Sequence, residues 1–389
     1  MKYLYLYIII LLTITVASCK KPYNPNVAAV KTNYLVVEGV INSGQDSTIV
    51  RLSRTVPLKD STQVLPESGA QVTVESDQNT SYLLYDFGNG KYVSPNLNLN
   101  GSGKYRLHIR TQSGKEYVSD FEPVKNTPPI DSVGFIQQSN GVQLYVNTHD
   151  PNNNTRYYRW DYTETWNFHA RYQSGFISDG TKMVTRPQAR QVYTCFATEG
   201  SSDIILGSSA KLSNDVIYQT MLTQIPSTAE KLETRYSVLV RQYALTKEEY
   251  DFWQNLKKNT EQLGSIFDAQ PSSVPGNIHC LSDPSEPVLG YIGVTNAQQK
   301  RIFIGREQLP QTWREVYPYQ CGIDSMFFKS FTGQNQVAEF LIPLGSSYYA
   351  VEPFTDNRGS LLGYTSSSAE CADCTIRGTT TTPPFWKWQ

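Results

Sequence analysis

The sequence predicts a mainly-β fold, in which a small N-terminal β-sandwich is followed by a larger mainly-β domain with one inserted helix. Three observations lead to this prediction. Short runs of alternating apolar residues recur between turn-forming residues, a pattern typical of antiparallel strands. Aromatic residues make up 12% of the chain, including 26 Tyr, and strands accommodate such residues well. A single segment, residues 246–263, combines helical apolar spacing with helix-end signals.

Residues 33–126 are predicted to form the sandwich, because strand and turn signals alternate closely there. The clearest strand is residues 104–110, in which Tyr105, Leu107 and Ile109 alternate with polar residues. A turn at residues 111–114 then predicts a hairpin. The remaining strands are expected at residues 35–41, 49–54, 71–75, 82–85 and 115–121. The stretch 69–120 resembles immunoglobulin-like and carboxypeptidase-regulatory-like domains, which mostly bind or space rather than catalyse.

Asn126-Thr127-Pro128-Pro129 predicts a domain boundary, since prolines interrupt regular structure. Residues 130–389 are expected to form the second domain. Thr246 and Glu249 have the spacing of a capping box at the start of the inserted helix, and Gly264 is expected to end it. Strands are expected at residues 130–136, 142–147, 288–294, 300–305 and 337–342.

An aromatic strand is predicted within YYRWDYTETWNF, where aromatic residues occupy alternate positions and Glu164 is the exception. One interpretation is a strand that faces the core. The other is an exposed aromatic platform for a glycan or peptide ligand, with Trp160, Tyr162 and Trp166 as its contact residues.

Residues 1–18 are predicted to be a lipoprotein signal peptide. Lys2 is followed by a mostly apolar run from Tyr3 to Ser18, which is short for a membrane span of about 20 residues. Val16-Ala17-Ser18-Cys19 looks like a bacterial lipobox, so we expect cleavage before Cys19 and attachment of acyl chains such as palmitate to that residue. An ordinary secretory signal is the alternative. Residues 19–32 contain prolines and are expected to form an extended, lipidated tether.

Composition argues against several partners and cofactors. The formal net charge is −1, which does not favour nucleic acid. The chain has 4 His, at dispersed positions, and we expect no metal centre and no cofactor. Asp150-Pro151-Asn152-Asn153-Asn154 resembles the start of a calcium loop but lacks the glycine that should follow, so a polar turn is expected.

The cysteines predict disulfides, since an exported protein meets an oxidising compartment. Cys371 and Cys374 form a CxxC motif, but the Thr- and Pro-rich residues after it do not predict the helix that a redox site requires. A zinc site with His279 and Cys280 is a further alternative. Two connectivities stay open: Cys371–Cys374 with Cys280–Cys321, leaving Cys195 unpaired, or a bond from either terminal cysteine to Cys321 or Cys280. Phe385, Trp386 and Trp388 could then dock the tail on the body.

No catalytic motif is expected. Ser208 follows Gly207, but its surroundings do not form the elbow of a serine hydrolase. A glycosidase needs two carboxylates at a defined separation, and the sequence does not single out such a pair.

Several segments together resemble one family, the Bacteroidota lipoproteins catalogued as domain of unknown function 4249. They are LVVEGVI (35–41), LSRT (52–55), TPPIDSV (127–133), the block 236–292 and the closing CADC…RG…PPFW. The resemblance implies an outer-membrane lipoprotein, often encoded beside TonB-dependent, SusC-like transporters. Lys20 and Lys21 replace the acidic residues that often mark surface export, so both the cell surface and the periplasmic face stay open.

These observations favour a lipid-anchored, non-catalytic binding or accessory subunit that partners a SusC-like transporter and an unidentified ligand. Two alternatives remain: a surface hydrolase acting on glycans or peptides, and a structural envelope lipoprotein.

Overall fold

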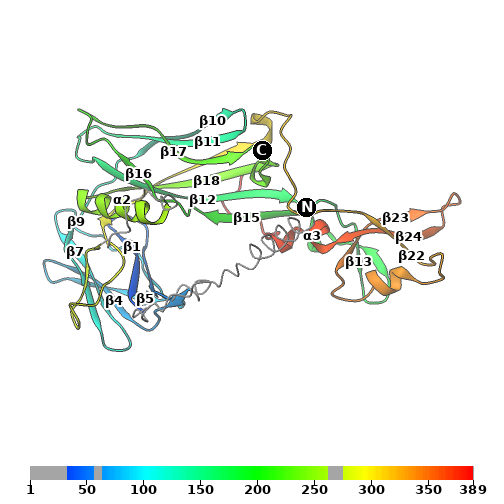
Figure 1. The fold of residues 1–389 in the computed structure, drawn as a ribbon, viewed down its shortest axis with the longest axis horizontal. Coiled ribbons are helices and arrows are strands. Elements are labelled where there is room, and N and C mark those ends of the chain that lie inside the picture. The colour runs from blue at the N-terminus through cyan, green and yellow to red at the C-terminus, as the bar shows by residue number, and fades with distance from the viewer. Residues whose placement is uncertain (1–32, 57–63, 262–274, 389) are drawn as a thin grey trace, which may run out of the picture.

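The computed structural model describes residues 33–56, 64–261 and 275–388 and shows three β-rich units arranged along an elongated molecule (Figure 1). The mainly-β prediction is confirmed, because strands far outnumber helices and each unit has its own hydrophobic core. The signal peptide, the lipidation site Cys19 and the tether 19–32 lie outside the described residues. We call the units first, second and third in chain order.

The first unit is a single curled sheet that surrounds one core. Inward-facing residues such as Leu52, Val72 and Leu107 are buried, whereas their neighbours along each strand are polar and more exposed. The turn at residues 111–114 joins two antiparallel strands, so the predicted hairpin is confirmed. The strands follow the order β19-β8-β7-β4-β5-β6-β2-β1-β20, with β3 and β9 beside β2 and β7. They are β1 (Leu35–Asn42), β2 (Thr48–Arg54), β3 (Leu65–Pro66), β4 (Gln71–Ser76), β5 (Ser81–Asp86), β6 (Lys91–Ser94), β7 (Lys104–Arg110), β8 (Glu116–Ser119), β9 (Glu122–Pro123), β19 (Ile278–Cys280) and β20 (Val294–Thr295).

Residues 275–295 return to this first unit, which corrects the expectation that 130–389 form one domain. Strand β19 pairs with β8, and β20 runs parallel to β1. The reason is burial, since the apolar side chains of this segment, including Ile278 and Ile292, complete the first core. Glu286 ties the segment down by accepting a hydrogen bond of 2.7 Å from the Tyr117 hydroxyl. The predicted strand 288–294 is reduced to β20, preceded by an isolated bridge at Leu289.

The second unit packs two sheets face to face over the largest core. One sheet has the order β10-β11-β17, and the other has the order β15-β12-β18-β21 with β16 beside β12. Strand β12 is the longest, and its inward-facing aromatic residues fill the space between the sheets. The strands are β10 (Ile130–Gln138), β11 (Gly141–Asp150), β12 (Tyr157–His169), β15 (Thr194–Gly200), β16 (Ile205–Ser208), β17 (Asp215–Pro226), β18 (Arg235–Ala244) and β21 (Gln298–Gly305).

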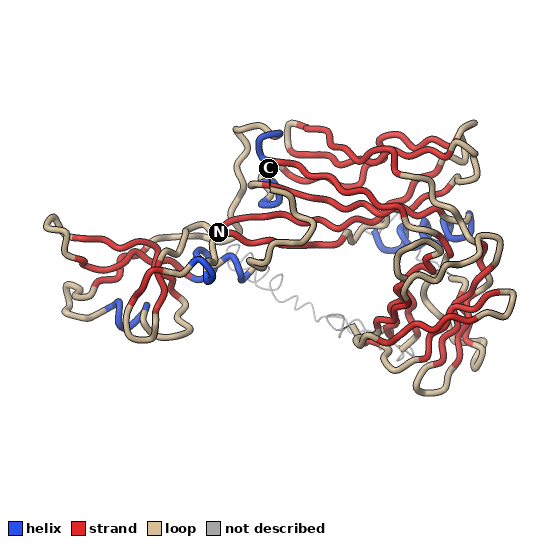
Figure 2. Tube along the Cα trace, turned by 180° about the vertical axis from the view of Figure 1, so that it is seen from behind, coloured by secondary structure: helices blue, strands red, loops and turns tan. Residues whose placement is uncertain are grey.

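Helix α2 (Lys247–Glu261) lies between the first and second units, as Figures 1 and 2 both show. The predicted cap is present, because the Thr246 hydroxyl accepts a hydrogen bond from the backbone N–H of Glu249 at 3.2 Å. The buried Phe252 packs its ring 5.5 Å from that of Tyr291, which belongs to the returning segment. Helix α2 therefore joins the two units through an apolar contact. Its expected stop, Gly264, lies outside the described residues.

The third unit is the smallest and combines a three-stranded sheet, β22-β24-β23, with a two-stranded hairpin. The strand predicted at 337–342 is wrong: Val337–Leu341 form a π-helical turn. The Ile342 N–H donates to the Val337 carbonyl at 3.0 Å and closes the turn, and both Val337 and Leu341 are buried in the small core. The elements are β13 (Phe176–Ser178), β14 (Met183–Thr185), β22 (Asp324–Phe327), β23 (Tyr348–Thr355), β24 (Leu361–Ser368) and α3 (Ala369–Ala372).

Candidate functional site

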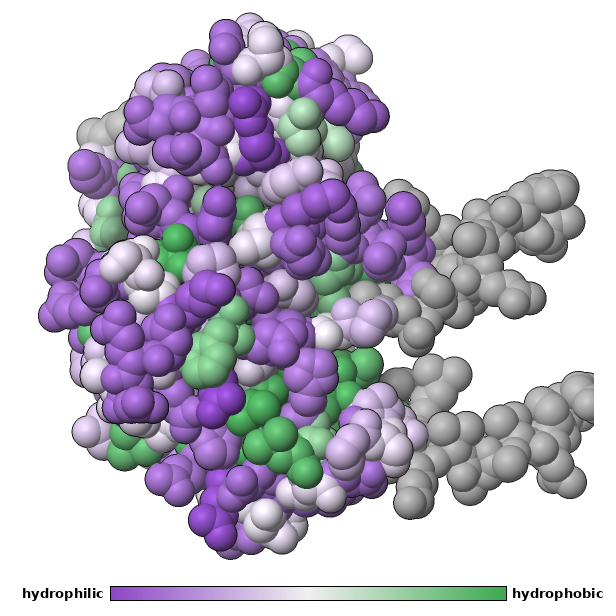
Figure 3. All heavy atoms as spheres, turned by 90° about the vertical axis from the view of Figure 1, so that its left-hand side faces the viewer, coloured by the Kyte–Doolittle hydropathy of each residue, from purple (hydrophilic) through white to green (hydrophobic). Residues whose placement is uncertain are grey.

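A cleft of about 690 Å³ lies between the first and second units. Strands β1 and β2 form one wall, and the other wall comes from β12, β18 and helix α2. Figure 3 shows the outer face of these two units as mostly hydrophilic, interrupted by apolar patches. The cleft mixes charged and aromatic side chains, which is typical of a site for a polar ligand. The charged and aromatic side chains in its lining include Glu38, Asp46, Arg51, Arg159, Asp161, Arg241, Tyr243 and Trp253.

Three charged side chains form the centre of the second-unit wall. Asp161 on β12 lies opposite Arg241 on β18 in the sheet register. Arg241 Nε donates to Asp161 Oδ1 at 2.5 Å, and Arg159 Nη1 lies 4.0 Å from Asp161 Oδ2. Two guanidinium groups thus share one carboxylate, and with Asp203 this wall carries two positive and two negative side chains that can pair with a strongly polar ligand.

Aromatic rings hold Arg159 in place. Its guanidinium carbon lies 4.6 Å from the ring centroid of Tyr243 and 4.6 Å from that of Trp253. Trp253 reaches this position from α2, about two helical turns after the capping residue Thr246. Within the described residues, Arg159 Nε is buried without a hydrogen-bond partner, so this charged cluster keeps one donor unsatisfied.

The first-unit wall contributes groups of both signs. Glu38 and Arg51 are exposed on neighbouring strands and lie opposite each other in the β1–β2 register. Asp46 lies in the loop between these strands and accepts a hydrogen bond of 2.7 Å from Gln299 Nε2 of β21. This hydrogen bond links the first unit to the second, so the Asp46–Gln299 contact bounds the cleft on this side.

The aromatic platform proposed from the sequence is wrong, and the core-facing interpretation of the same strand is confirmed. Trp160, Tyr162 and Trp166 are only 1%, 5% and 9% exposed. Trp160 Nε1 donates to Gln242 Oε1 at 2.8 Å, so even its polar atom is satisfied inside the core. The exceptional Glu164 is also buried, where it accepts a hydrogen bond from the Tyr236 hydroxyl at 2.7 Å.

Sequence reasoning missed the residues that do line the cleft. Arg159 and Asp161 alternate with the buried aromatic residues of the same strand, so they share its opposite face. That alternation was a visible signal of a polar outer face. The partner Arg241 and the stacked Trp253 carry no comparable signal, because they meet the strand only through β-sheet pairing and the placement of α2.

Two buried carboxyl groups lie beside the cleft, at the contact between α2 and the returning segment. Burial raises the pKa of Glu249 to about 7, although Arg159 opposes the rise. Burial also raises the pKa of Glu122, which accepts hydrogen bonds from the Tyr291 hydroxyl at 2.6 Å and from Asn277 Nδ2 at 3.1 Å. Both carboxyls therefore keep their proton to a higher pH than an exposed glutamate does.

Stability is expected to fall as pH rises from about 5 to 8, because folded Glu249, with a pKa raised to about 7, holds a proton that the unfolded carboxyl (4.5) has released. The contribution is fully present below pH 4.5 and is lost as pH rises through 7. Glu249→Gln should therefore leave the free energy of unfolding little changed at pH 5 and raise it at pH 8, by on the order of 3 kcal/mol. Urea unfolding at several pH values measures this. Glu248→Gln, at the exposed neighbouring position, is the matched control; if both variants show the same pH dependence, the expectation fails.

The C-terminal tail is held by two disulfides that differ from the leading prediction. Cys195 pairs with Cys374 and Cys321 pairs with Cys371, while Cys280 is free and buried. The CxxC motif does not close on itself. The Cys321–Cys371 bond agrees with the alternative connectivity, but the partner of Cys374 comes from β15 and was not foreseen.

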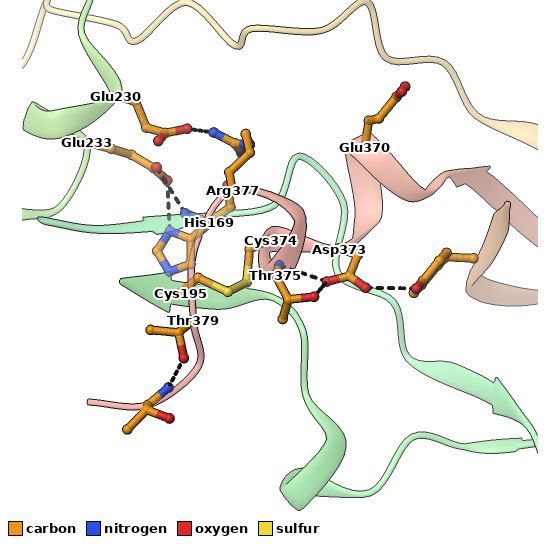
Figure 4. Close-up of a disulfide and its surroundings, with 12 residues drawn as sticks. His169, Cys195, Glu230, Glu233, Glu370, Asp373, Cys374, Thr375, Arg377 and Thr379 are labelled. Atoms are coloured by element: carbon orange, nitrogen blue, oxygen red, sulfur yellow. Dashed lines mark hydrogen bonds and ion pairs between the residues drawn. A yellow bond between two sulfur atoms is a disulfide. The ribbon is translucent and has the colours of Figure 1, made fainter. Parts of the chain in front are cut away.

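Charged and aromatic contacts reinforce this tail (Figure 4). Arg377 forms an ion pair with Glu230 and lies 4.6 Å from the ring centroid of Phe168. Trp386 is buried, and its ring centroid lies 5.0 Å from that of Phe196 on β15. The expected docking of the tail aromatics is confirmed for Trp386, whereas Trp388 stays largely exposed.

Two further groups of polar residues, around His169 and Asp150, have structural roles. His169 Nδ1 lies 2.8 Å from Glu233 Oε1, and the same carboxylate accepts from the His169 backbone, so Glu233 fixes this histidine beside the tail. Asp150 accepts backbone hydrogen bonds from Asn152 and Asn154, which makes the calcium-like stretch a polar turn. Within the described ranges, no group of three or more His, Cys, Asp or Glu side chains is arranged to hold a metal ion.

A comparison with protein families gives a match over most of the chain. The family described as "Domain of unknown function (DUF4249)" matches residues 20–301, which is more than half of the chain. This range includes both walls of the cleft but not the third unit's sheet or the tail cysteines. No curated protein matches the chain. In the part of the chain that the structure describes, none of the helices has the length and apolar character needed to cross a bilayer.

Proposed function

The chain belongs to the family described as domain of unknown function (DUF4249), and we propose that it is a lipid-anchored, non-catalytic binding or accessory subunit of a TonB-dependent, SusC-like transporter. In this proposal it is an outer-membrane lipoprotein of a Bacteroidota cell. Cys19 carries the acyl chains, and the described body begins some residues further on.

The observation that carries the proposal is the cleft between the first and second units. Its volume of about 690 Å³ is within the usual range for ligand sites. Arg159, Asp161 and Arg241 supply charged hydrogen-bonding groups, and Tyr243 and Trp253 supply ring faces. Such a mixture recognises polar ligands such as glycans and peptides, which are chemically suited to uptake by a transporter.

The carboxyl groups in and around the cleft favour binding over catalysis, because the raised pKa values found here belong to groups outside the lining. The carboxylate of Asp161 is shared by two guanidinium groups. The carboxyl groups with raised pKa values, Glu122 and Glu249, are buried outside the lining of the cleft. A general acid that protonates a ligand in the cleft would need both a raised pKa and direct access to that ligand. Glu122 and Glu249 have the raised pKa but do not line the cleft.

We expect the tagged full chain, purified from detergent-solubilised membranes of its native host, to bring a TonB-dependent barrel with it. The matched variant Cys19→Ser loses the acyl attachment point and should move from the membrane fraction to the soluble fraction. Mass spectrometry of the purified fractions measures both outcomes.

Three results would contradict the proposal. A Cys19→Ser chain that stays in the membrane would contradict the proposal that acyl chains on Cys19 anchor the protein. A wild-type chain recovered without a barrel would contradict the proposal that it partners a transporter. Turnover of a glycan or peptide substrate by the purified protein would favour the surface hydrolase instead.

A further inference from the structure

A second pocket, with a volume of about 460 Å³, lies in the third unit and shares no lining residue with the cleft. It is bordered by the β13–β14 hairpin, by the residues after the π-helical turn and by the start of β23. The volume is within the range of small-ligand sites. One wall is apolar and aromatic and contains Phe176, Met183, Leu341, Leu344, Tyr348 and Tyr349.

Beside these residues the lining contains Arg186, a charged side chain that is only 6% exposed. Its Nε donates to the Ser174 carbonyl at 3.0 Å, and Nη1 donates to the Arg190 carbonyl at 3.2 Å. Nη2 donates to the Ser174 hydroxyl at 2.9 Å and to the Phe176 carbonyl at 3.3 Å. A guanidinium has five N–H groups, so one on Nη1 remains without an acceptor among these bonds.

All the acceptors around Arg186 are neutral. Among the described residues, no carboxylate lies within ion-pair distance of it. A buried charge is costly unless an opposite charge compensates it, and burial accordingly lowers the pKa of Arg186. The ring centroid of Tyr349 lies 5.5 Å from its guanidinium carbon and compensates only in part.

The carboxylate of the pocket, Asp373, is already occupied. It accepts hydrogen bonds from the Tyr349 hydroxyl at 2.8 Å, from the Thr375 backbone N–H at 2.8 Å and from the Thr375 hydroxyl at 2.6 Å. Figure 4 shows Asp373 directed towards these groups. Arg190 adds a second, exposed cation to the same pocket. The pocket therefore has two guanidinium groups against one occupied carboxylate.

We infer that this pocket binds the C-terminus of a peptide that ends in an aliphatic or aromatic residue. The terminal carboxylate supplies the missing negative charge to Arg186 and Arg190, and the last side chain lies on the apolar wall. Gln191 and Thr380 also line the pocket and offer hydrogen-bonding partners for the peptide amides. A fatty acid has the same charge and apolar body but lacks those amides. The inference is independent of the transporter proposal, because it concerns a different unit.

Calorimetric titration of the purified full chain tests this with three probes: acetyl-Leu-Phe, its C-terminal amide, and octanoate. We expect the acid to bind at least about tenfold more tightly than the amide, because the amide lacks the charge that Arg186 and Arg190 recognise. Octanoate should bind more weakly than the peptide acid. Equal binding of acid and amide would overturn the inference, and octanoate binding as tight as the peptide acid would overturn the peptide assignment.

Variants locate the site. Arg186→Gln should abolish the preference for the acid, but this buried position is also structural, so its folding is checked by circular dichroism. Arg190→Gln, on the exposed side of the pocket, should weaken acid binding several-fold without affecting the fold. Arg358→Gln removes the same charge from an exposed turn of the same unit and should leave binding unchanged. If Arg190→Gln and Arg358→Gln have the same effect, the site lies elsewhere and the inference fails.

Discussion

Replacing Cys195 and Cys374 together by alanine is expected to lower the free energy of unfolding by about 4 to 5 kcal/mol. The bond joins residues 179 positions apart, and a cross-link over so long a loop removes much conformational freedom from the unfolded chain. It also holds the tail on β15, where Trp386 packs against Phe196. Urea unfolding followed by tryptophan fluorescence, under non-reducing conditions, measures the change.

Two further variants serve as controls for this experiment. Removing the Cys321–Cys371 bond should cost about 1 kcal/mol less in the chain-entropy account, because that bond closes a loop of 50 residues. Cys280→Ala removes a buried thiol without breaking a bond and should cost only about 1 kcal/mol. An effect of the Cys195/Cys374 double variant no larger than that of Cys280→Ala would mean that the bond does not contribute to the stability of the body.

Trp160→Ala is expected to destabilise the protein by about 3 to 5 kcal/mol, the range for truncating a buried Trp or Phe. Trp160 is among the largest fully buried side chains in the described ranges and lies at the centre of the second core. Its loss also leaves Gln242 Oε1 without the donor that now satisfies it, inside an apolar environment. The midpoint of urea unfolding gives the size of the effect.

Tyr218→Ala is the matched control, since this residue is in the same unit but 74% exposed. Its effect should stay within about 0.5 kcal/mol. A Trp160→Ala variant that unfolds at the same urea concentration as the parent, but has lost affinity for a ligand, would reverse our assignment of this strand and restore the aromatic platform.

Local patterns were enough to predict most strands and the helix. Tyr105, Leu107 and Ile109 lie on the buried side of β7 as their alternation indicates, and Thr246 caps α2 as its spacing to Glu249 indicates. These signals depend only on neighbours within a few residues, where side-chain period and capping chemistry act directly.

Features that depend on distant partners could not be predicted in this way. The bond between Cys195 and Cys374 depends on where β15 lies after folding, and no local sequence pattern indicates that position. The cleft arises similarly, because Arg241 meets Asp161 only through the pairing of β12 with β18. The error at 337–342 had a different cause: a short apolar run fits a strand or a helical turn equally well, and its burial pattern does not distinguish them.

The return of residues 275–295 to the first unit has a practical consequence for dissecting the molecule. β19 and β20 stand at the two ends of the strand order of the first sheet. A fragment cut at the apparent boundary near residue 126 would lack both, and would present the unpaired backbone of β8 and β1 along its two sides. Exposed sheet edges of this kind recruit other strands and promote aggregation. The first unit is thus a discontinuous module whose independent expression requires fusing residues 275–295 to it.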